Sequence, residues 1–469
     1  MSEHPTPVHG PERWPGGAEQ QARSPRSGAF QIVAALLALA LVLATVLAAR
    51  LDQERRRSAN LAAQLEYEQD AAAELRRTLE GDAPTALEGV QRAVERIRGL
   101  SPRDEVDITF LTREQLASRI LALFERDTTE EDFEASQRIL IALGVVPPDF
   151  DLREALLRVQ QEEVVGFYDT TDRSLVVASE EAADPSPLDR VVFAHEYTHA
   201  LTHQRFGLGR LDALENSQGD AALAFKALAE GDATLLMQQY TVQGLSTAEQ
   251  LSLLEQPDTG ASDSLPAFVR DELFFPYREG LAFVRALHER GGFDAVDDAY
   301  RDPPVSTEQV LHPERYFERD DPRRVRLPNV GDALGRGWRT LEGGQFGELD
   351  LRAMADEPAA STGLTSQEAE RAAAGWDGGS YVGLASGDDV VVAVATVWDS
   401  AGEAAEAVEL LGSWLPLRYR NLGERFEVTG GEGWDAPDGA GLVALAGERV
   451  VLVFAPTPAL AERALGAFR

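Results

Sequence analysis

The 469-residue sequence contains no cysteine, three methionines and only seven histidines. The absence of cysteine excludes disulfides, thiolate metal ligands and a cysteine nucleophile. Basic residues are also scarce: 44 lysines and arginines are outnumbered by 79 aspartates and glutamates, which gives a formal net charge of −35 at pH 7. This imbalance argues against a nucleic-acid partner, because nucleic acid requires a basic surface. Hydrophobic residues make up 44% of the chain, which is enough for packed cores in two or three domains.

The first 84 residues differ in composition from the rest. Residues 1–28 are rich in proline, glycine, serine and charge, and we expect a disordered N-terminal tail. Residues 29–49 carry no charge and are long enough to cross the hydrocarbon core of a bilayer. We therefore predict an uncleaved single-pass transmembrane helix, with a cleaved signal peptide as the alternative. Residues 50–84 are charged and helix-favouring, which predicts a juxtamembrane helix.

Three of the scarce histidines lie in one helix-favouring segment, residues 187–206, which contains His-Glu-Tyr-Thr-His at 195–199. On a helix, residues four apart share one face about 6 Å apart along the axis, so His195 and His199 can bind one tetrahedral zinc ion. Glu196 lies beside the first histidine, where it can act as the general base toward an attacking water. The alternative is a chance match on a core helix.

Local signals predict where this helix begins and ends. Ser186 is a good N-cap, Pro187 suits the first helical position and Asp189 favours the positive N-terminal end. We expect the helix to end near Gly207.

The third ligand is expected on a second helix, over residues 220–240, whose apolar run contains Glu230 and Asp232. A carboxylate in such a run is costly unless it is paired or bound to a metal, so Glu230 is the candidate. The alternative is a glutamate on the helix surface. His203 is a rival ligand, but an ion shared by the two motif histidines leaves it roughly 9 Å further along the axis.

From residue 85 onward the pattern predicts an α+β protein. Residues 85–325 are expected to form one mainly helical domain that contains the motif, with helices over 87–100, 112–127, 130–143 and 152–161 and a β-hairpin over 163–179. Residues 326–469 are expected to form a C-terminal β-β-α-β-β-α module, a small α+β sandwich with antiparallel strand pairs. Its polar residues form no catalytic constellation, so we expect a binding or packing module.

Other candidate site residues lie on both sides of the motif. The first strand of the hairpin is expected to form a sheet edge that holds an extended peptide by strand addition, through Val165, Gly166 and Phe167. Tyr277 and His312 are candidates for stabilising the oxyanion of a tetrahedral intermediate. The alternative for each of these two is a structural role, because nothing in the sequence places either near the metal.

The sequence His-Glu-Tyr-Thr-His-Ala-Leu, followed 31 residues after His199 by Glu230-Gly-Asp-Ala, resembles the zincin metallopeptidases of the gluzincin type. It is closer still to a group of secreted or membrane-anchored bacterial metallopeptidases, over about residues 160–320 and, less specifically, the C-terminal module. The resemblance implies a zincin-like fold with zinc bound by the two motif histidines and Glu230. Gluzincins often place a further carboxylate four residues after that glutamate to orient a histidine. Here that position is Thr234, so Asp232 or another residue must serve.

We therefore predict a membrane-anchored metallopeptidase that binds one Zn²⁺ per chain and hydrolyses a peptide or protein substrate. Glu196 would take the proton of the attacking water and pass it to the leaving amine. The lipid bilayer is the other partner, through residues 29–49. The alternative is a catalytically inactive zinc-binding scaffold or protein-interaction module at the cell surface. No oligomeric state is predicted.

The same resemblance predicts that the catalytic part lies outside the cytoplasm. The charges that flank residues 29–49 favour the opposite orientation slightly, since three arginines precede the span and four follow it closely.

Overall fold

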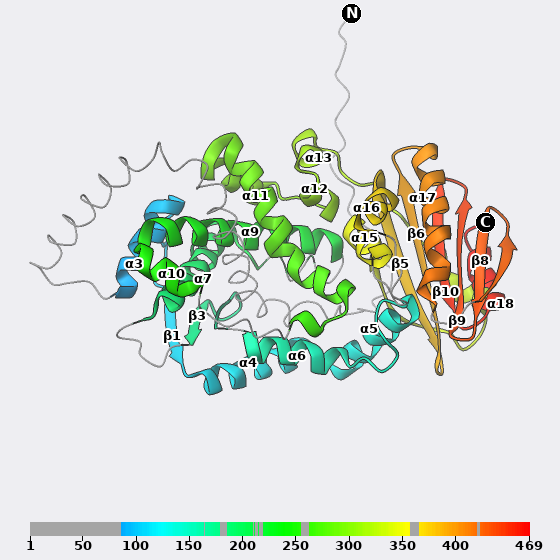
Figure 1. Cartoon of the computed structure of the whole chain (residues 1–469), viewed down its shortest axis with the longest axis horizontal. Helices are drawn as coiled ribbons and strands as arrows, with labels where there is room; N and C mark the ends of the chain where they lie inside the picture. Colours follow the sequence, from blue (N-terminus) through cyan, green and yellow to red (C-terminus); the bar gives the residue numbers. More distant parts are fainter. Residues whose placement is uncertain are drawn as a thin grey trace, which may run out of the picture.

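The structure is a computed structural model of the chain (Figure 1). It describes residues 86–163, 165–178, 185–209, 211, 214, 219–254, 262–356, 365–419 and 423–469. The predicted tail, transmembrane helix and juxtamembrane helix all lie outside the described residues. No helix in the described part of the chain is long and apolar enough to span a membrane. The described chain is mixed α+β, with a helical part followed by a large antiparallel sheet (Figure 1).

The helical part begins with four helices in the predicted ranges: α3 (Ala86–Arg98), α4 (Arg113–Asp127), α5 (Glu130–Leu143) and α6 (Leu152–Glu163). The predicted hairpin is also present, since β2 (Gly166–Asp169) pairs antiparallel with β3 (Ser174–Ala178). A strand that was not predicted, β1 (Asp107–Leu111), runs parallel to β3. The order in this three-stranded sheet is β1-β3-β2, so β2 is an edge strand, as expected.

The motif helix α7 (Pro187–Phe206) has the predicted ends. The side chain of Ser186 accepts a hydrogen bond from the backbone N–H of Asp189 (3.2 Å), and the carboxylate of Asp189 accepts one from the N–H of Ser186 (3.0 Å). Such a capping box satisfies two backbone donors that a helix start leaves unpaired. The helix ends at Gly207, whose positive φ of 79° suits glycine.

Helix α7 packs on α9 (Gly219–Gly244), and α9 packs along α11 (Ala267–Arg301). The helices α9 and α11 cross where two glycines meet. A Cβ on Gly231 would lie 2.2 Å from the carbonyl oxygen of Gly280, and a Cβ on Gly280 would lie 2.2 Å from that of Ala227. Only glycine permits this backbone contact. The crossing brings together Glu230, which precedes Gly231, and Tyr277, one turn before Gly280.

Seven antiparallel strands make the C-terminal sheet, in the order β4-β5-β6-β10-β9-β8-β7. The strands are β4 (Arg339–Gln345), β5 (Trp376–Ser386), β6 (Asp389–Trp398), β7 (Glu424–Val428), β8 (Gly431–Ala436), β9 (Gly439–Ala446) and β10 (Arg449–Ala455). Helix α17 (Ala401–Trp414) packs on one face of the sheet (Figure 1). Helix α18 (Pro458–Gly466) packs on the other face together with α14 (Val330–Leu334).

The predicted β-β-α-β-β-α order was incomplete. Its elements correspond to β5, β6, α17, β9, β10 and α18, but it omitted β4, β7 and β8. These three strands occupy the two sides of the sheet and contain glycine and charged residues in place of an apolar run. Strand pairing with the central strands therefore overrides their weak local preference.

The remaining described helices are short: α10 (Thr247–Leu253), η1 (Ser262–Ser264), α12 (Thr307–Leu311), α13 (Pro313–Glu318), α15 (Glu348–Asp356), α16 (Ser366–Ala373) and η2 (Leu415–Arg418). One hydrophobic core extends from the helical part to the sheet. It includes Phe193 and Tyr277 as well as Trp376 and Trp414. The core thus continues across the boundary predicted between residues 325 and 326.

Candidate metal centre

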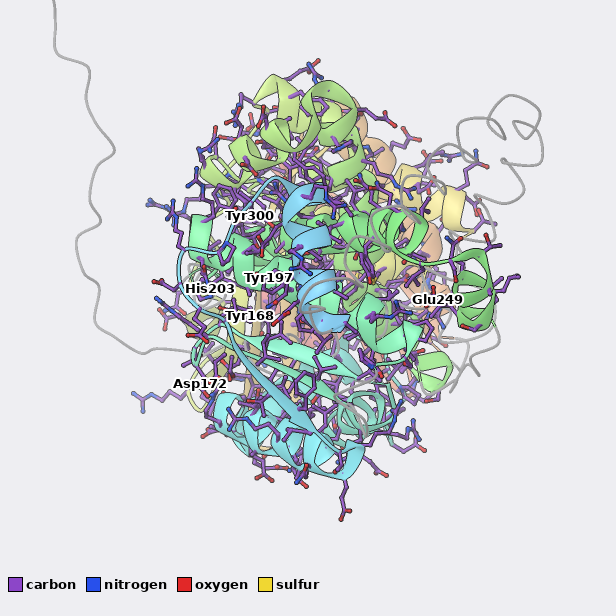
Figure 2. All side chains as sticks on the ribbon, turned by 90° about the vertical axis from the view of Figure 1, so that its left-hand side faces the viewer. Tyr168, Asp172, Tyr197, His203, Glu249 and Tyr300 are labelled. Carbon is purple, nitrogen blue, oxygen red and sulfur yellow. The ribbon has the colours of Figure 1, made fainter. Side chains whose placement is uncertain are left out.

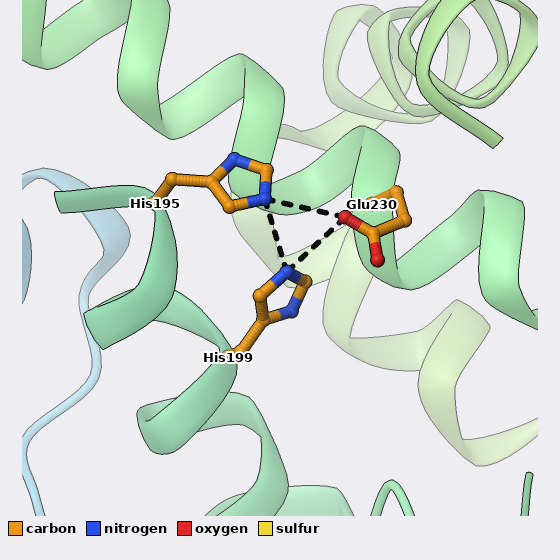
Figure 3. Close-up of side chains that lie close together, drawn as sticks. All are labelled: His195, His199 and Glu230. Carbon is orange, nitrogen blue, oxygen red and sulfur yellow. Dashed lines mark hydrogen bonds and ion pairs between the residues drawn. The ribbon is translucent and has the colours of Figure 1, made fainter. Parts of the chain in front are cut away.

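The side chains of His195, His199 and Glu230 converge between α7 and α9 (Figure 3). Nε2 of His195 lies 3.1 Å from Nε2 of His199, and Oε2 of Glu230 lies 3.2 Å from each of these nitrogens. All three residues are buried. Among the described residues, this is the one group of three or more histidine and carboxylate side chains placed to hold a metal ion.

These separations fit a tetrahedral ion. Bonds of 2.0–2.1 Å to a tetrahedral zinc ion place neighbouring ligand atoms about 3.3 Å apart. Two imidazole nitrogens and one carboxylate oxygen are also a common ligand set of catalytic zinc, which leaves the fourth position open. The three residues therefore fit such an ion without rearrangement.

Without a metal, the charges of this group are strongly coupled. Burial disfavours a charged imidazole, but the adjacent Glu230 carboxylate outweighs it and raises the pKa of His199 to about 9. Burial likewise opposes ionisation of Glu230, but the two imidazoles outweigh it and lower the pKa of this carboxyl group. A metal ion must displace the proton on His199, so metal binding should release protons.

Glu196 lies beside the group and is only 2% exposed. Burial raises its pKa above the usual value, although the charges of the two motif histidines and a hydrogen bond from the backbone N–H of Tyr168 oppose this. Its Oε1 has no hydrogen-bond partner among the described residues. A buried carboxylate with a raised pKa and an unused acceptor can take a proton from a water at the metal.

Two residues of strand β2 direct their backbone N–H and C=O groups away from β3, on the side of the motif helix α7. The carbonyl of Val165 accepts a hydrogen bond from β3 (2.7 Å), and antiparallel alternation points the backbone of Phe167 toward β3 as well. The backbone groups of Gly166 and Tyr168 therefore face the outer edge. The N–H of Tyr168 reaches Glu196 from this edge. Of the three residues predicted to hold a substrate, only Gly166 offers outward backbone groups, and Tyr168 provides the others.

His203 lies outside the group. Its Nδ1 is 3.1 Å from the hydroxyl of Tyr168, and Figure 2 shows the two side chains next to each other. Burial lowers the pKa of His203, and the charge of Arg173 lowers it further. The structure thus brings Glu230, and not His203, to the two motif histidines.

The two candidates for oxyanion stabilisation have different positions. Tyr277 is buried beside the metal group, and burial together with the charges of Glu230 and Glu196 raises its pKa well above the usual value. Its hydroxyl forms no well-aligned hydrogen bond to a described residue. His312 instead contacts Glu348 at 3.0 Å. His312 follows α12, and α12 packs against the first turn of α9. That turn is about 15 Å from Glu230 along the axis of α9.

Asp232 and Thr234, considered for orienting a histidine, form no hydrogen bond to His195 or His199 in the described part of the chain. Asp232 accepts hydrogen bonds from Arg98 Nε (2.9 and 3.1 Å) and from the hydroxyl of Tyr300 (3.1 Å), and so ties α9 to α3 and α11. The hydroxyl of Thr234 and Nδ1 of His195 are both buried without a partner among the described residues.

A pocket of about 460 Å³, counting space open to solvent, lies at the metal group. It is lined by Tyr168, Thr170, Glu196, His199, Leu208, Leu211, Phe225, Lys226, Ala229 and Glu230. Sequence reasoning missed Phe225 and Lys226, which lie about one turn before Glu230 on α9. Their spacing from Glu230 was the available signal, because residues three to five apart on a helix lie near one another.

Comparison with known proteins adds little about this centre. Residues 339–464, from the start of β4 into α18, match a family described as a domain of unknown function (DUF8575). No curated protein and no solved structure matches the chain. The family match covers the C-terminal sheet and does not include the metal group.

Proposed function

We propose that this chain is a zinc-dependent metallopeptidase of the gluzincin type. The observation that carries the proposal is the convergence of His195, His199 and Glu230 within 4.8 Å, with Glu196 beside them. Separations of 3.1–3.2 Å between the ligand atoms match a tetrahedral ion. The accompanying base argues against a purely structural site, because a structural zinc site needs no carboxylate of this kind.

When bound, zinc would supply a Lewis acid that polarises the scissile carbonyl and lowers the pKa of a water. Glu196 takes one proton from the water as its oxygen attacks the carbonyl carbon, and then passes that proton to the leaving amine. The C–N bond breaks, and the products are a carboxylate and an amine. The hydroxyl of Tyr277 would donate a hydrogen bond to the carbonyl oxygen and stabilise the negative charge that develops there.

Substrate would lie along β2 as an added strand. The outward backbone groups of Gly166 and the carbonyl of Tyr168 offer hydrogen bonds to an extended peptide. Because Tyr168 also contacts Glu196, a peptide on this edge would have its backbone next to the base. We further propose that residues 29–49 anchor the chain in the cell membrane with the catalytic part outside the cytoplasm.

The test is a cleavage-site profile with a peptide library. The full chain in detergent should cleave internal peptide bonds, should lose activity with a chelator and should regain it when zinc is added back. A chain that retains one zinc ion and cleaves no peptide would contradict the peptidase and favour the inactive scaffold.

A further inference from the structure

A second cavity, which shares no lining residue with the pocket at the metal group, lies at the junction between the helical part and the sheet. It measures about 730 Å³, counting space open to solvent, and lies between α5, α6, the start of α11 and β4–β5. Its walls are mainly apolar and include Phe133, Leu140, Leu156 and Phe268. A concave, largely apolar cavity with a few polar groups is the usual form of a small-molecule site.

The polar groups of this cavity are three carboxylates, from Glu272, Glu342 and Asp350, with the hydroxyls of Ser136 and Tyr381. Among the residues that the structure describes, no arginine, lysine or histidine lines it. Glu342 is 8% exposed and Asp350 is 7% exposed. A pocket of one charge sign favours a ligand of the opposite sign.

Both buried carboxylates are held in place by neutral donors. Oε2 of Glu342 accepts a hydrogen bond from the hydroxyl of Ser136 (2.8 Å), and Oε1 accepts one from the hydroxyl of Tyr381. Oδ2 of Asp350 accepts one from the N–H of Gly347 (2.8 Å). Within the described part of the chain, neither carboxylate forms an ion pair. A buried charge without a counter-charge is unfavourable, so a cation in the cavity would relieve this cost.

We propose that this cavity binds an alkylammonium ion, a short hydrocarbon chain that ends in a primary amine. The hydrocarbon contacts the walls from α5, α6 and α11, and the ammonium group binds Glu342 and Asp350. A primary amine is protonated at neutral pH, as a lysine side chain is. The proposal does not depend on the metallopeptidase function.

The test uses hexylamine, 1-hexanol and hexanoate, which share a chain length and differ in charge. Each is titrated by calorimetry into the full chain in nanodiscs of neutral lipid, with empty nanodiscs as the reference. Hexylamine should bind one site at least tenfold more tightly than 1-hexanol, and hexanoate should not bind. Butylamine should bind about tenfold more weakly than hexylamine, because each methylene lost from an apolar cavity costs about a three- to fourfold change in affinity.

Two variants assign the binding to this cavity. Glu342→Gln keeps a hydrogen-bond acceptor and removes one of the two charges that bind the ammonium group, so the preference for hexylamine over 1-hexanol should fall at least threefold. Leu140→Trp, at a half-buried position in the wall, should abolish the binding of both. Glu134→Gln, at an exposed glutamate on the same helix, is the matched control and should bind as the wild type does. Equal affinities of the wild type for the amine and the alcohol, or no saturable binding, would overturn the proposal, as would unchanged binding by Leu140→Trp.

Discussion

Glu196 is the residue on which the proposed chemistry most depends, and it is not one of the three converging ligands. Glu196→Gln should preserve the fold and the bound metal, because the amide is nearly isosteric with the carboxylate. Turnover should fall by at least about 10²–10⁴, the usual contribution of a general base. Peptide hydrolysis and metal content, measured on the same preparation, check this. Hydrolysis at the wild-type rate by a variant free of contaminating peptidase would contradict the mechanism.

The hydroxyl of Tyr277 is the group that we propose to assist at the carbonyl oxygen. Tyr277→Phe removes this hydroxyl and keeps the ring in the core, so kcat should fall by about 10²–10³, as for loss of an oxyanion donor, with metal content unchanged. Tyr300→Phe is the control, since its buried hydroxyl on the same helix α11 binds Asp232 instead. That variant should lower stability and leave kcat nearly unchanged. If the two variants behave alike, Tyr277 has only a structural role.

The sequence predicted some site residues because local rules govern them. His195, Glu196 and His199 follow from helical spacing, and Glu230 follows from the cost of a carboxylate in an apolar run. The role of Tyr168 could not be predicted, because it depends on which backbone groups of β2 pair with β3. Nor could Tyr277 and His312 be ranked from the sequence, because their distances from the metal group depend on how helices far apart in the chain pack together.

At the scale of elements, the contact between α9 and α11 determines where Glu230 and Tyr277 lie. Gly231→Ala would place a methyl group 2.2 Å from the backbone of α11, so the helices must separate. We expect the free energy of unfolding to fall by about 1–3 kcal/mol, with weaker metal binding. Denaturant unfolding with and without zinc measures both effects. Gly89→Ala in α3 is the control, because a Cβ there meets nothing within 4 Å and alanine favours a helix. Equal stability of the two variants would show that the contact is unimportant.

Also at the scale of elements, strands with a strong local pattern were predicted, whereas a strand whose partner is distant in the chain was not. The central strands β5, β6, β9 and β10 were predicted, because they contain apolar runs between turn residues. The strand β1 was missed because its parallel pairing with β3 joins segments far apart in the chain. Local pattern alone does not identify such a partner.

At the scale of the whole molecule, Asp220 joins the helical part to the C-terminal part. It lies in the first turn of α9, and its carboxylate accepts hydrogen bonds from the hydroxyl (2.6 Å) and the N–H (3.2 Å) of Thr307. Gly347, just before α15, packs directly against it. Burial, together with the charges of Asp350 and Glu348, raises the pKa of Asp220 to about 7, although the hydrogen bonds from Thr307 oppose this.

This pKa predicts a pH-dependent stability. An unfolded aspartate ionises near pH 4, so between about pH 4 and 7 the folded state binds more protons at Asp220 than the unfolded state does. The stability contributed by this extra proton binding at Asp220 is therefore fully present below about pH 4 and is lost as the pH rises to about 7. Asp220→Asn, which cannot ionise, should remove this dependence, worth at most about 1.4 kcal/mol per pH unit. Denaturant unfolding across this range should show wild type losing stability relative to the variant as pH rises. A constant difference would contradict the assignment.

The metal content of dialysed protein tests the central claim most directly, because Glu230 and His203 are rival third ligands that differ in position. We predict one zinc ion per chain in the wild type and in His203→Ala, since His203 contacts Tyr168 instead of the metal group. Glu230→Ala should bind zinc at least tenfold more weakly, because it removes one of three converging ligand atoms. Loss of zinc from His203→Ala together with its retention by Glu230→Ala would contradict the proposed metal centre.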